Sequence, residues 1–357
     1  MFASQMFKVF RSRVPWAVMK VLLRVCELPI SGGWESTRKN ITQGDNGIIR
    51  DEFIEKINLL EKRYFDYLLV GEKSVQLYQV KREEIDNAIS YLKTLEIPTN
   101  IFHETYPYSL DLEKLDSANS NPELVEIRES ETSLFLVFCT KRLFTERRKI
   151  NTEDLSEEAQ DGLKVFDEII GIRNCPRQFF DVVVLSKITD LVEVRIDISH
   201  GITDKDRLRA FLSTVSAFND LSRGKNGKKI IIESINIFSL IDGLYQSQEG
   251  KVFELSFLTD EGSVKSEKFR KFDLRDELYH KAGKEAVHHI NPFRLGISWK
   301  FPILEGLESQ PEMILPGHSR SLSTLSQRLD EVIISKCSGL NDYDFVFSKI
   351  ITYLNEL

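Results

Sequence analysis

The sequence predicts an α+β protein in which an N-terminal winged-helix-like domain is followed by a mixed β-sheet domain with flanking helices. Two patterns support this fold class. Near the N-terminus, three amphipathic segments with helical spacing precede two β-rich runs separated by a short turn. Between residues 152 and 238, the predicted elements follow in the order helix, strand, strand, helix, strand, which is typical of a mixed sheet covered by helices.

The composition is that of an ordinary globular protein. Of the 357 residues, 41% are hydrophobic and 29% are charged, which is enough apolar material for true cores. With 48 basic and 55 acidic residues the net charge is -7, so any binding to nucleic acid must be confined to a local surface. The four cysteines form no C-x-x-C pair, which argues against a zinc site and favours a reducing, cytoplasmic or otherwise intracellular setting.

The first predicted domain covers residues 1–110. Three helices are expected at residues 14–27, 34–41 and 49–63. A hairpin at 64–80 would form the wing, and one additional helix is expected at 82–95. No apolar run is long enough to span a bilayer. Residues 1–26 contain five basic residues and no acidic residue, so mitochondrial targeting is an alternative to a basic first helix.

The second predicted domain covers residues 123–357, after a linker-like stretch rich in Ser and Asn, and a subdivision near residue 245 is an alternative. It is expected to open with a hairpin and an acidic helix, and then to contain two β-branched strands joined by a tight turn. A helix capped by Thr203 follows. The hairpin is expected at residues 124–150, the acidic helix at 152–171, the two strands at 179–199 and the capped helix at 204–221. Further strands are expected at 228–238, 251–258, 263–272 and 295–301, and further helices at 322–335 and 342–357.

Local basic surfaces suggest contact with the phosphates of duplex DNA. Residues 1–41 carry seven basic and two acidic side chains, and further basic clusters occur in three predicted loop regions, at 141–149, 223–229 and 265–271. The candidate nucleic-acid-binding residues are Arg11, Arg13, Lys20, Arg38, Lys39, Arg147, Arg148, Lys149, Lys228 and Lys229. The resulting hypothesis is a DNA-binding or complex-scaffolding protein without catalysis of its own and without a cofactor.

A protein partner is the competing interpretation of the same domain. The third predicted helix contains four acidic residues, which would oppose phosphates if it were a recognition helix. The domain then serves as a dimerisation or partner-docking element, and the protein is a pure interaction subunit or a homo-oligomer. The sequence also contains no GxxxxGK[ST] or GxGxxG motif, which argues against an ATPase or a dinucleotide enzyme.

One pair of predicted strands offers a catalytic alternative. Asp181 lies on the first strand, and Glu193 and Arg195 lie on the second. In order and spacing, residues 152–238 resemble the core of metal-dependent nucleases of the PD-(D/E)xK type. That resemblance implies that Asp181 and Glu193 bind Mg²⁺ and that Arg195 stands at the position of the catalytic Lys. A guanidinium stays protonated and cannot act as a base, and the same alternation fits a half-buried strand with a solvated face.

Overall fold

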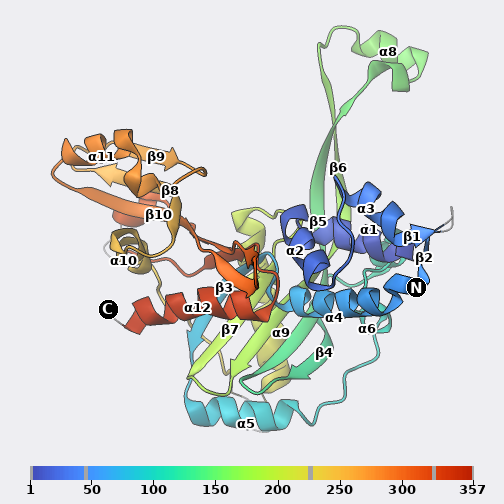
Figure 1. Ribbon diagram of the computed structural model, residues 1–357, viewed down its shortest axis with the longest axis horizontal. Coiled ribbons are helices and arrows are strands. Elements are labelled where there is room, and N and C mark those ends of the chain that lie inside the picture. The colour runs from blue at the N-terminus through green and yellow to red at the C-terminus, as the bar shows by residue number, and fades with distance from the viewer. Residues whose placement is uncertain (1–2, 44–46, 224–227, 324–326, 356–357) are drawn as a thin grey trace.

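The computed structural model describes residues 3–43, 47–223, 228–323 and 327–355, and it confirms the α+β class (Figure 1). Its centre is a ten-stranded sheet in the order β4-β5-β6-β7-β3-β14-β13-β10-β8-β9, with every neighbouring pair antiparallel. The strands are β3 (Lys73–Gln79), β4 (Glu123–Glu129), β5 (Ser133–Ile150), β6 (Ile169–Ser186), β7 (Leu191–Asp197), β8 (Lys251–Thr259), β9 (Val264–Lys268), β10 (Ile290–Ser298), β13 (Glu312–Leu315) and β14 (Val332–Ser335).

Helices cover both faces of this sheet, and two small hairpins lie outside it. The hairpins pair β1 (Thr42–Gln43) with β2 (Ile48–Ile49) and β11 (Phe301–Leu304) with β12 (Leu307–Ser309). The α-helices are α1 (Ala3–Arg13), α2 (Trp16–Val25), α3 (Trp34–Ile41), α4 (Ile54–Val70), α5 (Arg82–Leu92), α6 (Ile101–Thr105), α7 (Leu112–Ser117), α8 (Glu157–Leu163), α9 (Asp204–Ser222), α10 (Leu240–Gln246), α11 (Leu278–Glu285) and α12 (Leu340–Asn355). The 3-10 turns are η1 (Asp51–Phe53), η2 (Thr152–Asp154), η4 (Leu274–Asp276) and η5 (Ser319–Ser323).

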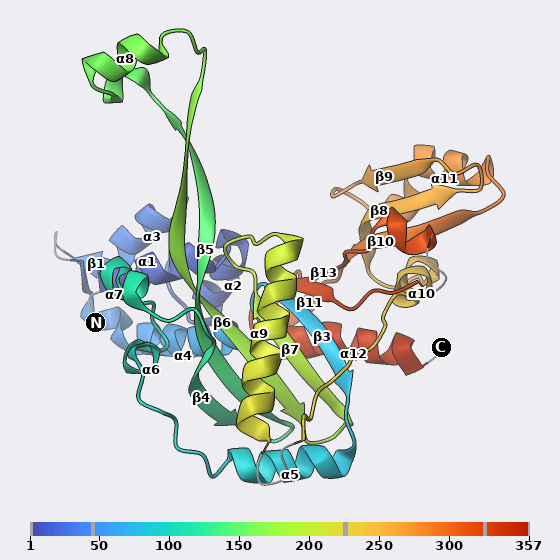
Figure 2. The same cartoon turned by 180° about the vertical axis from the view of Figure 1, so that it is seen from behind.

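The two faces of the sheet bury two separate apolar cores, because alternate residues of a strand point to opposite sides. Val182 and Val184 of β6 belong to the first core, which is covered by α1, α2, α4, α10 and α12. Val183 and Leu185 belong to the second core, which is covered by α5 and α9 (Figure 2). The position of a residue in β6 or β7 therefore determines which of the two cores its side chain enters.

The wing of the predicted winged helix is absent, and this part of the prediction is wrong. Residues 64–70, expected as the first strand of the hairpin, complete helix α4, in which Tyr64 and Leu68 to Val70 are buried. The expected second strand, β3, pairs with β7 on one side and β14 on the other. The large sheet therefore crosses the boundary that we predicted between residues 110 and 123.

Three other predicted elements also differ from the structure. Of the acidic helix at 152–171 only η2 and α8 form, because residues from Ile169 onward pair with β5, and Phe166 is exposed. Residues 228–238 form no strand; instead Asn219 of α9 hydrogen-bonds the backbones of Ile230 and Ile231. In the expected helix at 322–335, residues 332–335 form β14, and residues 324–326 lie outside the described residues.

A long two-stranded arm projects from the body (Figures 1 and 2). β5 and β6 pair without interruption from Ser133↔Ser186 to Ile150↔Ile169, whereas β4 accompanies β5 only as far as Cys139. We call residues 141–177 the arm, residues 141–150 and 169–177 its shaft, and residues 151–168, which include α8, its tip.

None of the described helices combines the length and the apolar character that a bilayer-spanning segment needs.

We expect Thr203→Ala to lower the free energy of unfolding by about 1 kcal/mol. The Thr203 hydroxyl accepts a hydrogen bond from the Asp206 N–H at 3.2 Å, as predicted for the start of α9. Alanine leaves this N–H without its capping partner. Urea denaturation measures the effect, and Thr203→Ser, which keeps the hydroxyl, should stay close to wild type; equal losses in both variants would contradict the capping role.

Candidate nucleic-acid interface

The root of the arm is held on one face of the sheet by Asp181, which is fully buried. Its carboxylate forms an ion pair with Arg142 of β5 and accepts hydrogen bonds from Thr214 Oγ1 of α9 and from the Asp197 N–H, each at 3.0 Å. Arg142 also lies over the Phe179 ring, 4.9 Å from its centroid. Asp181 thus joins both strands of the arm to α9.

Asp197 holds the same root on the opposite face. Its Oδ2 atom receives hydrogen bonds from Arg13 Nη1 at 2.8 Å and from the Phe180 N–H at 2.9 Å. Lys73 is opposite Asp197 in the β3–β7 register, and its Nζ donates to the Phe180 carbonyl oxygen at 2.6 Å. Arg13 further donates to the carbonyl oxygen of Gln178. The end of α1 and the centre of the sheet therefore meet where the arm leaves the body.

The titration behaviour of this cluster follows from burial and pairing. Burial alone raises the pKa of Asp197, but Lys73, Arg13 and the backbone donors outweigh it, so the pKa of this carboxyl lies well below its ordinary value. Burial lowers the pKa of Lys73 to about 8 against the attraction of Asp197 and Asp181. Asp197 is consequently ionised at neutral pH and compensates two buried cations.

Glu193 and Arg195 form a third buried group, near α12. Arg195 Nε and the Tyr343 hydroxyl each donate to Glu193 Oε2 at 2.9 Å, and the Arg195 guanidinium lies 4.0 Å from the centroid of the Tyr343 ring. All seven residues of β7 are buried, so the strand has no solvated face of the kind expected from its alternation. Glu193 and Arg195 thus link β7 to the C-terminal helix.

This geometry separates Asp181 from the other two proposed nuclease residues. Val182 pairs with Arg195 and Val184 with Glu193, so Glu193 and Arg195 share the face of the first core. Asp181 occupies the alternate position and points to the face of α9. Among the described residues, no group of three His, Cys, Asp or Glu side chains is arranged to hold a metal ion. The contacts of all three residues are those of structural ion pairs.

Basic side chains gather on the shaft of the arm, although Arg142 is paired with Asp181 and Arg173 with Glu146. The shaft contains seven basic residues and one acidic residue, whereas the tip contains seven acidic residues and one basic residue. Arg147, Arg148 and Lys149 are exposed, and in the described part of the chain neither arginine is within 4.0 Å of a carboxylate. Lys149 pairs with Glu168 at the junction with the tip. Three predicted nucleic-acid-binding residues are therefore adjacent and open to solvent.

The N-terminal candidates divide into surface and buried residues. Arg11 and Lys39 are exposed on α1 and α3, which pack against each other at the root of the arm (Figures 1 and 2). Arg38 is half-buried and forms an ion pair with Glu35. Arg13 is 4% exposed and is occupied by Asp197, so it cannot contact phosphate as predicted. Residues two apart on a helix point to nearly opposite sides, and the spacing of Met6, Phe10 and Arg13 puts Arg13 on the buried face of α1. The sequence analysis missed this signal because it expected the first helix to begin at residue 14.

Of the remaining candidates, Lys20 is half-buried on α2. Lys228 and Lys229 are exposed just beyond the end of α9 and do not join this surface. That end of α9 packs near α5, at the opposite end of the body from the arm (Figure 2). The predicted basic loops therefore form separate surfaces.

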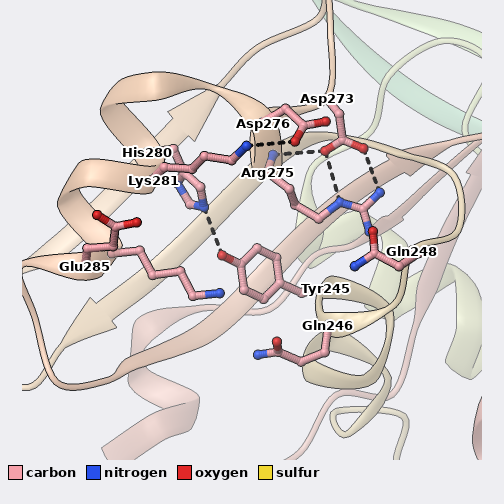
Figure 3. Close-up of a pocket in the computed structure, with 10 residues that line it drawn as sticks. Tyr245, Gln246, Gln248, Asp273, Arg275, Asp276, His280, Lys281 and Glu285 are labelled. Atoms are coloured by element: carbon pink, nitrogen blue, oxygen red, sulfur yellow. Dashed lines mark hydrogen bonds and ion pairs between the residues drawn. The ribbon is translucent and has the colours of Figure 1, made fainter.

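A polar cavity of about 680 Å³ lies in the lobe that contains β8, β9 and α11 (Figure 3). At its wall the Tyr245 hydroxyl is 2.9 Å from His280 Nε2, and His280 Nδ1 is 2.5 Å from Glu267. Burial raises the pKa of Tyr245 to about 12. The sequence analysis did not detect this chain of hydrogen bonds, because its three residues come from separate elements.

Comparison of the chain with protein-family models, with curated proteins and with solved structures found no match.

We expect Asp197→Ala to lower the free energy of unfolding by about 3 to 5 kcal/mol, because Arg13 and Lys73 would stay buried without their counterion. Chemical denaturation measures the loss. Asp220→Ala removes the exposed ion pair with Arg223 and should cost less than about 1 kcal/mol. Equal costs for the two substitutions would contradict the role of Asp197 as the anchor of the root.

The same anchor predicts an acid-sensitive contribution to stability. Because the pKa of folded Asp197 is depressed, its stabilising effect is present above its unfolded pKa of about 3.9 and is lost as the pH falls further. Between about pH 4 and pH 2, wild-type stability should therefore fall more steeply than that of Asp197→Asn. Parallel pH profiles for the two proteins in urea denaturation would contradict this assignment.

Proposed function

We propose that the protein binds duplex DNA without catalysis of its own, through the shaft of the arm and the exposed cations of α1 and α3. The observation that carries the proposal is the concentration of basic side chains on a projecting two-stranded ribbon within a chain of net charge -7. Phosphate contacts from Lys and Arg supply most sequence-independent affinity for DNA. The global charge of the chain does not oppose binding that is confined to this ribbon.

The dimensions of the shaft support this proposal. The B-DNA major groove is about 12 Å wide and admits a two-stranded β-ribbon. The ten residues from Lys141 to Ile150 extend about 34 Å at about 3.4 Å per residue, which is close to one helical turn of the duplex. The buried root fixes the direction of the ribbon, so a docked duplex would lie against the body at α1 and α3.

The acidic tip defines how far along the arm a duplex can lie. Its seven acidic side chains are all exposed and would repel phosphates. Binding is therefore limited to the shaft and the root, which leaves the tip outside the complex. The four cysteines are unpaired, as is usual in a reducing intracellular compartment, where DNA is available.

We expect the triple substitution Arg147→Ala, Arg148→Ala and Lys149→Ala to weaken binding to labelled duplex DNA. If each residue contacts one phosphate, the slope of log affinity against log salt should become shallower by about 2 to 3. Fluorescence anisotropy over a salt series measures this slope. A denaturing gel of the same DNA, incubated with Mg²⁺, should show intact strands.

The matched control is Lys228→Ala with Lys229→Ala, which removes exposed cations at the other end of the body. This variant should retain the wild-type affinity and slope. If the wild-type protein fails to bind at low salt, or if the control weakens binding as much as the shaft variant, the proposed interface is wrong.

A further inference from the structure

The tip of the arm carries an acidic and apolar surface that is open to solvent. Its seven carboxylates are exposed, and so are Val165 and Phe166, at 83% and 58%. Large exposed apolar side chains next to one another are typical of interaction surfaces. The tip therefore has the character of a docking element whose partner should combine positive charge with apolar side chains.

One face of the shaft has this complementary character. In the β5–β6 register Arg147 is opposite Ile172 and Lys149 is opposite Ile170, so these four side chains share a face. Leu143 occupies the same face two positions before Thr145, because alternate residues point the same way. Ile170, Ile172 and Leu143 are more than half exposed. This face combines cations with aliphatic side chains, as the tip requires.

The tip cannot cover the shaft of its own arm. It lies beyond the outer end of the shaft in both views (Figures 1 and 2). Within the described chain, the ion pair between tip and shaft is Lys149–Glu168, at 3.1 Å, where the two segments join. The complementary shaft that this tip can reach therefore belongs to another molecule.

We propose that two copies of the chain associate through their arms, so that the acidic tip of each lies on the basic shaft of the other. Each arm contains both complementary surfaces, with opposite charges of equal number. An antiparallel arrangement about a two-fold axis forms both contacts at once and closes the assembly as a dimer. The exposed apolar residues of tip and shaft become buried in the same contact.

This dimer also regulates DNA binding, a consequence that rests on the function proposed above. The tip presents carboxylates to Arg147 and Lys149, two of the cations that contact phosphates in the DNA complex. A duplex and the second copy therefore compete for the shaft, and DNA should dissociate the dimer. The linkage is reciprocal, because whatever stabilises the dimer weakens the apparent affinity for DNA.

The test is analytical ultracentrifugation of the full chain without DNA, at about 50 mM salt and again at about 500 mM salt, where exposed charges are screened. We expect a dimer at low salt and dissociation at high salt. Two charge-reversal variants should each weaken the dimer about tenfold or more. The shaft variant is Arg147→Glu, Arg148→Glu and Lys149→Glu, and the tip variant is Glu157→Lys, Glu158→Lys and Asp161→Lys.

Mixing the two variants provides the decisive measurement. Each set of three reversals brings its own segment to zero net charge. In a mixed dimer, the unchanged acidic tip of the shaft variant meets the unchanged basic shaft of the tip variant, which restores one of the two contacts. The mixture should therefore dimerise more tightly than either variant alone. All six positions are exposed, and circular dichroism confirms that each variant is folded. A wild-type monomer at low salt, or a mixture that stays monomeric, would overturn the proposal.

The DNA titration separates this inference from the proposed function. The tip variant should bind duplex DNA at least as tightly as wild type, because it loses only the competing carboxylates. A dimer that forms through the arms without any DNA binding would support the inference and contradict the function. DNA binding by a protein that is monomeric at low salt would do the reverse.

Discussion

The buried ion pairs at the root of the arm constrain the rest of the structure. Asp181 and Asp197 approach the root from opposite faces of the sheet and bind Arg142 on one side and Arg13 on the other. Buried charges remain folded only with their partners in place, so β5, β6, α1 and α9 must meet at one point. Lys73 adds the central strand β3 to this cluster. The direction in which the arm leaves the body is thereby fixed by charge pairing together with apolar packing.

Beyond this anchor, the arm separates charge along its length in a way that the net charge of the chain conceals. The shaft is basic, the tip is acidic, and the two carry opposite charges of equal number. In a paired ribbon this segregation is held at fixed distances, and among the described residues Lys149 and Glu168 form an ion pair where shaft and tip join. The same cations are therefore available to a duplex or to the tip of another copy, and DNA binding and self-association become linked properties of one surface.

The sequence predicted local elements well and long-range pairing poorly. Helix α3 spans the predicted residues, and α9 starts at the predicted cap, because amphipathic spacing and capping are local signals. Residues 64–70 are rich in aromatic and aliphatic side chains that suit a strand, yet burial on the sheet retains them in α4. The pairing of β3 with β7 and β14 joins segments more than a hundred residues apart, for which the sequence carries no local signal. The opposite orientations of Asp181 and Glu193 depend on the β6–β7 register. The ion pair that buries Arg13 depends on Asp197, which is far away in the sequence.

Hydrogen–deuterium exchange of the full chain, with and without a short duplex, tests most directly whether the arm is the DNA-binding element. The account predicts slower exchange on DNA binding in residues 141–150 and 169–177 and in α1 and α3, with no change around the cavity that contains His280. Protection confined to the body, with an arm that exchanges equally in both states, would contradict it.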